Sequence, residues 1–280
     1  MTWSIFAAVL LAALLHASWN ALVKGSDDKV VGMTAVTVGH APLALVMIPF
    51  LPGIPPEAWP WCAASLAGHL GYQLFLMRAY GMGDYTQVYP IARGTGPALV
   101  TIVTLLFLDR PIALPALAGI ALVCGGIAGL ALLRGGDGLR NPRAVGAALV
   151  TGCFIAAYSL TDGQGARVAG SALAYIAWMT TLNAVIFAAY VRVVHPGTLT
   201  AVARQAKRTF LLGGSFSVLA YMIAVWAMTR TSVAQVAALR ETSVVFALLI
   251  GAVFLGERLT PVKAGAVAVI LSGAMLIRFG

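Results

Sequence analysis

The chain has 280 residues, of which 60% are hydrophobic and only 10% are charged, and its mean hydropathy is +0.92. Ordinary soluble domains contain about 25% charged residues, so this composition excludes a water-soluble globule and indicates an integral membrane protein. The net charge of +9 does not indicate nucleic-acid binding, because no basic stripe with interleaved aromatic side chains accompanies it.

Ten apolar stretches follow one another along the chain, each close to the roughly 20 residues that a helix needs to cross a bilayer. Charged or Pro/Gly-rich links separate them, such as KGSDDK (24–29), LPGIPPEAWP (51–60) and RGGDGLRNPR (134–143). The predicted spans are residues 3–23, 30–51, 60–81, 84–108, 112–133, 143–163, 171–192, 209–229, 232–255 and 260–278. The predicted fold class is therefore an all-α integral membrane protein with ten transmembrane helices.

An internal repeat relates residues 79–125 to residues 227–273 at a constant shift of 148. The turn LDRP (108–111) coincides with GERL (256–259), and several further residues are identical at this shift. The shift predicts one repeat of five spans in residues 1–138 and a second in residues 139–280. An odd number of spans inverts the second repeat relative to the first, and inverted repeats typically surround a transport site near the bilayer midplane.

The distribution of basic residues predicts the orientation of the spans. The links after spans 1, 3, 5, 7 and 9 hold eleven lysine and arginine residues, and the opposite side holds four. Cytoplasmic loops are enriched in Lys and Arg, so we expect these odd-numbered links in the cytoplasm and both termini outside. Within residues 112–133, Gly125 and Gly129 lie four residues apart and predict close helix packing.

Polar side chains recur at helical spacing inside the apolar spans. Such residues usually face the interior of the bundle or a water-filled cavity, although single Ser, Thr or Asn residues more often only join helices by hydrogen bonds. The candidates for a cavity lining are His16, Asn20, His69, Tyr72, Gln73, Tyr158, Asp162, Asn183 and Tyr221.

The segment YPIARGTGP (89–97) places Arg93 inside an apolar run, on one helical face with Tyr89. The 148-residue shift superimposes Arg93 on Glu241, so two equivalent spans carry opposite charges at equivalent depth. Three interpretations remain open. The two residues form a buried ion pair that joins the halves, they bind a substrate that carries both charges, or Glu241 takes up a proton during turnover.

Three motifs carry a resemblance to a known family: HASWNALVK (16–24), YPIARGTGP (89–97) and FLGERLTPVKAGAVAVILSG (254–273). With the two five-span halves, they resemble the EamA branch of the drug/metabolite transporter superfamily. The resemblance implies a secondary transporter in a bacterial inner membrane, often an exporter of amino acids, whose helices enclose a central cavity. The matching residues are Trp19, Asn20, Lys24, Tyr89, Arg93, Tyr158 and Glu241.

The predicted function is secondary active transport, in the export direction, of a small polar metabolite such as an amino acid or other zwitterion or anion. In this hypothesis Arg93 meets the acidic group of the substrate, and Glu241 or Asp162 meets the amine. The first span contains no carboxylate, unlike the small multidrug exporters of the superfamily, so export of lipophilic cations is the less favoured alternative.

A passive channel or a membrane enzyme is the alternative from another class, but no HExxH or GxSxG motif is present. The cysteines lack metal-ligand spacing and no ATP-binding loop occurs, so we expect no metal and no cofactor. The expected partners are a small-molecule substrate, the lipid bilayer and a coupling proton, and no nucleic acid. The oligomeric state is left open.

Overall fold

The computed structural model describes residues 1–24, 28–83, 85–107, 112–133, 141–254 and 260–280. All regular secondary structure in these ranges is helical, which confirms the predicted all-α class. The matching turns LDRP and GERL lie outside the described residues.

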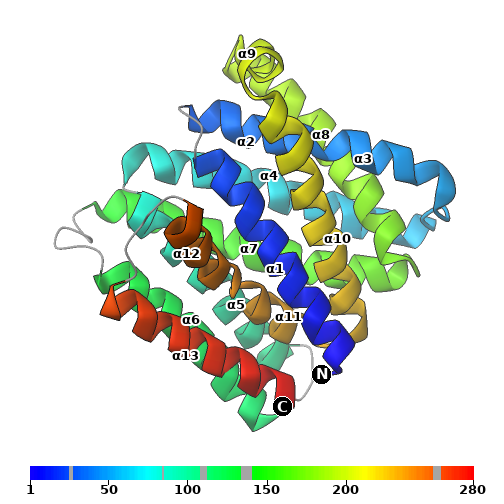
Figure 1. Ribbon diagram of the computed structural model, residues 1–280. Helices are drawn as coiled ribbons and strands as arrows, with labels where there is room; N and C mark the ends of the chain where they lie inside the picture. The colour runs from blue at the N-terminus through cyan, green and yellow to red at the C-terminus, as the bar shows by residue number, and fades with distance from the viewer. Residues whose placement is uncertain (25–27, 84, 108–111, 134–140, 255–259) are drawn as a thin grey trace.

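The chain forms a bundle of tilted helices in which segments far apart in sequence lie side by side (Figure 1). The helices are α1 (Trp3–Lys24), α2 (Lys29–Val38), α3 (His40–Met47), α4 (Trp59–Met82), α5 (Tyr85–Phe107), α6 (Leu114–Leu133), α7 (Pro142–Val168), α8 (Ala172–Val194), α9 (Thr198–Gln205), α10 (Gly214–Arg230), α11 (Val233–Arg240), α12 (Ser243–Phe254) and α13 (Pro261–Phe279). A π-helical turn, Thr209–Gly213, leads directly into α10.

Eight helical segments in the described residues are long and apolar enough to cross a membrane. Helix α6 contributes a shorter apolar stretch, Leu114–Leu130, and α4, which carries His69 and Gln73, is not among the eight. Large apolar side chains are widely exposed, among them Phe107, Leu114 and Val193. Such a surface suits lipid tails and not water, so the chain is a multi-pass membrane protein.

Two predicted spans are interrupted. The span predicted at 30–51 breaks at Gly39, between α2 and α3, and the span predicted at 232–255 breaks at Glu241 and Thr242, between α11 and α12. At the first break the chain passes very close to the start of α10, because a Cβ atom on Gly39 would lie 2.1 Å from the carbonyl oxygen of Phe210. Only a glycine fits this crossing.

Helices α6 and α13 pack against each other over much of their length. Their closest approach is at Gly119 and Gly273, where a Cβ atom on either residue would lie within 2.6 Å of the carbonyl oxygen of the other. The predicted packing role of Gly125 and Gly129 is wrong, because no heavy atom lies within 4 Å of a Cβ atom built on either residue.

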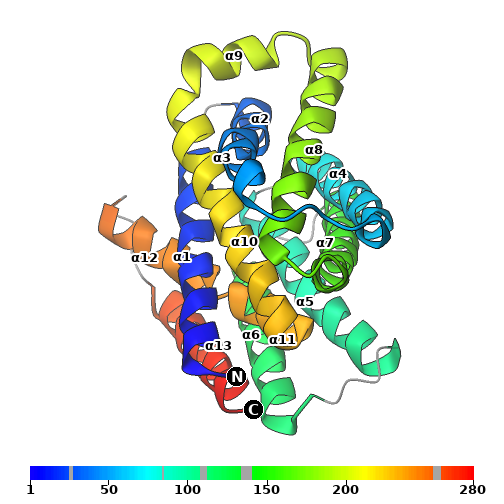
Figure 2. The ribbon, with the colours of Figure 1, turned by 90° about the vertical axis from the view of Figure 1, so that its right-hand side faces the viewer.

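The two ends of the chain lie together at one end of the bundle (Figures 1 and 2). The amino-terminal nitrogen lies 3.5 Å from the carbonyl oxygen of Arg278. At the opposite end, α9 crosses over the bundle in the link between α8 and α10 (Figure 2).

Candidate substrate site

A polar cavity of about 70 Å³ lies inside the bundle, enclosed by residues from α1, α2, α3, α4, α5, α7, α8, α10 and α11. We call it the central cavity. Most of the candidates from the sequence line it, namely His16, Trp19, His69, Tyr72, Gln73, Arg93, Tyr158, Asn183 and Tyr221. Residues from both halves of the chain therefore meet at one site.

A second cavity of about 470 Å³, which we call the vestibule, shares Trp19, Met33 and Tyr72 with the central cavity. It extends from these side chains toward Asp28 and Lys29 at the start of α2. The remaining candidates on α1 and α5, Asn20 and Tyr89, line the vestibule. Trp19 and Tyr72 therefore separate the central cavity from the wider space beside it.

Arg93 and Glu241 form a buried ion pair between α5 and the break that follows α11. The Arg93 Nε atom donates a hydrogen bond to Glu241 Oε2 at 3.0 Å, and Nη2 lies 2.8 Å from Oε1. Both side chains are almost fully buried, at 5% and 3% exposure. Because two parallel contacts hold the guanidinium against the carboxylate, the charge of Arg93 is matched inside the protein.

Arg240, the last residue of α11, also lines the central cavity and is buried. Its guanidinium lies over the ring of Tyr221, with the Cζ atom 5.1 Å from the ring centroid. Within the part of the chain that the structure describes, no carboxylate lies within 4 Å of it. Arg240 thus presents to the cavity a permanent positive charge that no ion pair neutralises.

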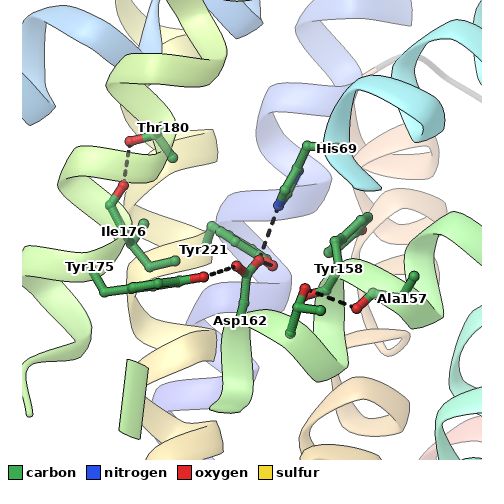
Figure 3. Close-up of polar contacts among 9 residues, drawn as sticks. His69, Ala157, Tyr158, Asp162, Tyr175, Ile176, Thr180 and Tyr221 are labelled. Carbon is green, nitrogen blue, oxygen red and sulfur yellow. Dashed lines mark hydrogen bonds and ion pairs between the residues drawn. The ribbon is translucent and has the colours of Figure 1, made fainter. Parts of the chain in front are cut away.

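Asp162 does not line the central cavity but joins four helices behind it (Figure 3). On α7 and fully buried, it accepts hydrogen bonds from the Tyr175 hydroxyl of α8, at 3.2 Å, and from the Tyr221 hydroxyl of α10. The Nε2 atom of His69 on α4 lies 3.1 Å from Asp162 Oδ2, the same oxygen that accepts from Tyr221. The carboxylate is therefore held by three polar partners, of which His69 and Tyr221 also line the central cavity.

An aromatic cluster surrounds this carboxylate. The ring of His69 stacks on the ring of Tyr158 at a centroid distance of 4.1 Å, and it meets Tyr221 edge-on at 5.3 Å. Across the cavity, Trp19 Nε1 donates a hydrogen bond to His16 Nδ1 at 3.3 Å, and the Asn20 amide donates to the His16 carbonyl oxygen. These contacts fix the positions of the rings that form the wall.

Other polar atoms of the wall have no hydrogen-bond partner among the residues that the structure describes. They are Gln73 Oε1 on α4, Asn183 Oδ1 on α8 and both ring nitrogens of His40 at the start of α3. The Gln73 amide nitrogen is used, because it donates to Thr37 Oγ1 at 3.5 Å. Buried polar atoms are nearly always hydrogen-bonded in proteins, so this part of the wall is suited to receive polar groups of a bound molecule.

Two residues of the cavity, His40 and Arg240, are absent from the candidates that the sequence indicated. His40 follows a glycine, and the other polar residues of its predicted span are the threonines Thr34 and Thr37, which more often only join helices by hydrogen bonds. Arg240 precedes Glu241, and its helix ends there, so an unbroken helix through both residues misplaces its side chain. The segment ALRETSVV (238–245) could have indicated Arg240, because it places a second arginine inside an apolar span.

The fold and the cavity together define the class: a multi-pass membrane protein whose helices enclose a polar site reachable from one end. Residues 143–279, just under half of the chain, match the model of the EamA-like transporter family. This match confirms the resemblance that the motifs carry, and it indicates a transporter of the drug/metabolite transporter superfamily and not an enzyme.

One solved structure, described as "Crystal structure of protein", is similar over 100% of this chain and 98% of its own, with a TM-score of 0.76 and 18% identity. At this identity the likeness shows the fold alone. No curated protein matches the chain by sequence.

Proposed function

We propose that this protein is a secondary active transporter that exports a small polar metabolite with an acidic group, either a zwitterion such as an amino acid or an anion. Arg240 carries the proposal, because a buried guanidinium that faces a cavity without a carboxylate partner is suited to bind a carboxylate or similar anion. Arg93 lines the same cavity but is already paired with Glu241.

The volume of the central cavity supports a small solute. Sites for drug-sized molecules usually measure about 300–1,000 Å³, and the central cavity measures about 70 Å³. Its lining also holds two arginines, so the cavity is small for a lipophilic drug and places positive charge beside its ligand. The multidrug alternative is therefore the weaker one.

For the membrane topology we propose ten spans in two inverted halves, residues 1–138 and 139–280, in the cytoplasmic (inner) membrane. Arg93 and Glu241, which are equivalent under the internal repeat, contact each other across the bundle. Contacts between equivalent residues are expected close to an axis of pseudo-twofold symmetry. The adjacent positions of the two chain ends support an even number of spans.

The proposed mechanism is alternating access at the central cavity, driven by a proton gradient. The vestibule leads from the cavity toward Asp28 and Lys29, the end that the basic residues assign to the cytoplasm. In export, substrate enters from this side past Trp19 and Tyr72. The breaks after Val38 and after Arg240 lie in the cavity wall, and interrupted helices of this kind form the sites of many secondary transporters.

Counterflow in proteoliposomes tests the proposal. Vesicles are preloaded with one unlabelled compound at a time from a panel of amino acids and organic acids. The labelled form of the same compound is then added outside, and its uptake is followed. We expect saturable uptake that internal substrate accelerates, for at least one compound with an acidic group. Uptake that rises linearly with concentration would indicate a channel, and absence of exchange for the whole panel would contradict the proposal.

A further inference from the structure

We propose that the substrate also carries an ammonium group, so that it is a zwitterion, and that Gln73, Asn183 and His40 bind this group. We call these three residues the acceptor wall. The inference rests on the proposed function, since it concerns the other end of the molecule whose acidic group meets Arg240.

The acceptor wall consists of polar side chains whose hydrogen-bonding capacity is unused. Gln73 and Asn183 are 4% and 3% exposed, and their side-chain oxygens Oε1 and Oδ1 have no partner. Neither ring nitrogen of His40 has a partner, and a neutral imidazole offers one acceptor nitrogen. Unpaired carbonyl oxygens and an imidazole nitrogen accept hydrogen bonds, and an ammonium group offers three donors.

The acceptor wall and Arg240 belong to different sides of the central cavity. The three residues of the acceptor wall come from α3, α4 and α8, and α8 packs against α2, α3 and α4, among others. Arg240 ends α11, which packs mainly against α5, α6, α1 and α10. In Figure 2, α2 and α3 lie in the upper half of the bundle and α11 lies in the lower half. A molecule in the cavity can therefore contact both sides with its two ends.

The charges around the cavity also favour a zwitterion over a simple anion. The Arg93–Glu241 pair is neutral, which leaves Arg240 on one side and Asp162 behind His69 on the other. On α4, Gln73 lies one helical turn from His69, which contacts Asp162, so the acceptor wall is on the side of the Asp162 carboxylate. A zwitterion brings a negative group to Arg240 and a positive group to the side of Asp162, whereas a monoanion meets only the first of these charges.

Matched ligand pairs test the inference on the purified protein. The binding of alanine, phenylalanine and glutamate is compared with that of propionate, 3-phenylpropionate and glutarate, which lack only the amino group. The readout is the shift of the thermal unfolding midpoint with ligand concentration, from which affinity is obtained. We expect wild type to bind at least one amino acid tenfold or more tightly than its deaminated partner.

Two variants on α8 provide the matched comparison. Asn183→Leu removes the unpaired amide, and we expect it to reduce the preference for the amino acid to threefold or less while binding of the deaminated acid is unchanged. Thr181→Val is the control, because Thr181 lies on the same helix outside the lining of the central cavity and its hydroxyl already donates to the Ala177 carbonyl oxygen at 2.8 Å. This control keeps the wild-type preference.

The outcomes separate the two proposals. Equal binding of both members of every pair by wild type, or equal effects of the two variants, rejects the acceptor wall and leaves an acid-binding transporter. Absence of binding by all six compounds rejects both the acceptor wall and the amino-acid form of the proposed function. Gln73→Leu repeats the test on α4, so a failure of Asn183→Leu to fold does not remove it.

Discussion

At the scale of single residues, three charged side chains of the site have different surroundings and different expected roles. The carboxylate of Glu241 is held by Arg93, that of Asp162 by two tyrosines and a histidine, and the guanidinium of Arg240 faces the cavity. A buried ion pair contributes little net stability, but removal of one partner leaves a buried charge without compensation. The first two groups are therefore expected to hold helices together, and the third to bind substrate.

The Arg93–Glu241 pair predicts a non-additive effect on stability. Glu241→Gln leaves the guanidinium of Arg93 buried and unpaired, so we expect it to lower the free energy of unfolding by about 3–5 kcal/mol. The double variant Arg93→Gln/Glu241→Gln removes both charges and is expected to recover a large part of this loss. Thermal unfolding of the four proteins of the double-mutant cycle measures the coupling, and additive effects would contradict the pair.

Substitution of Asp162 is expected to lower stability while the lining of the central cavity stays unchanged, because Asp162 lies outside that lining. Asp162→Asn removes the charge that three partners share, and hydrogen bonds to charged groups contribute about 1.5–3 kcal/mol. We expect a decrease of that order in the free energy of unfolding. The neighbouring Thr161→Val is the control, because the Thr161 hydroxyl only bonds carbonyl oxygens of its own helix. If both variants unfold at the same temperature, Asp162 does not join the helices.

At the scale of helices, composition predicts where the apolar segments lie but not where they break. Both interrupted spans are mostly apolar on either side of the break, and the break at Gly39 follows from tertiary packing, namely its crossing over the start of α10. The spacing of Tyr158 and Asp162 shows that they share a helix face, yet the meeting of α4, α8 and α10 at Asp162 depends on long-range contacts. For the same reason His40 and Arg240, each beside a break, were missed.

Glycines of α6 predict opposite effects of the same substitution. In Gly119→Ala the new Cβ atom would lie 2.5 Å from the Gly273 carbonyl oxygen, so α6 and α13 must separate and stability falls. In Gly125→Ala the Cβ atom meets nothing within 4 Å, and the higher helix propensity of alanine stabilises by up to about 1 kcal/mol. Thermal unfolding in detergent compares them, and equal effects would contradict the close contact between α6 and α13.

At the scale of the whole molecule, the proposal of two inverted halves that meet at the central cavity accounts for a site lined by residues from both halves. The contact between Arg93 and Glu241 joins positions that the repeat makes equivalent, so the sequence predicted that their depth in the membrane is the same. The sequence did not predict that the two side chains touch. Opposite charges at equivalent positions are expected both for an ion pair and for two residues that bind opposite groups of one substrate. Only the packing of α5 against α11 distinguishes them.

The proposed topology predicts which surfaces are reachable from outside the cell. In a background without Cys62, Cys124 and Cys153, we expect Thr2→Cys to react with a membrane-impermeant maleimide in intact cells, because both termini face outward. Thr200→Cys on α9 is expected to react only after the cells are permeabilised. Both positions are exposed, so burial does not limit the reaction. The reverse pattern would invert the proposed orientation and the direction of the vestibule.

The central claim is that Arg240, and not Arg93, binds the acidic group of the substrate. Counterflow with the best substrate of the wild-type panel tests this claim most directly. The assay compares Arg240→Gln with the neutral double variant Arg93→Gln/Glu241→Gln. The control is Arg192→Gln, because the Arg192 side chain is exposed near the end of α8. We predict that Arg240→Gln lowers exchange at least tenfold at equal folded yield, while the other two variants retain most of it. Full exchange by Arg240→Gln, with loss of exchange in the neutral double variant, would contradict the account.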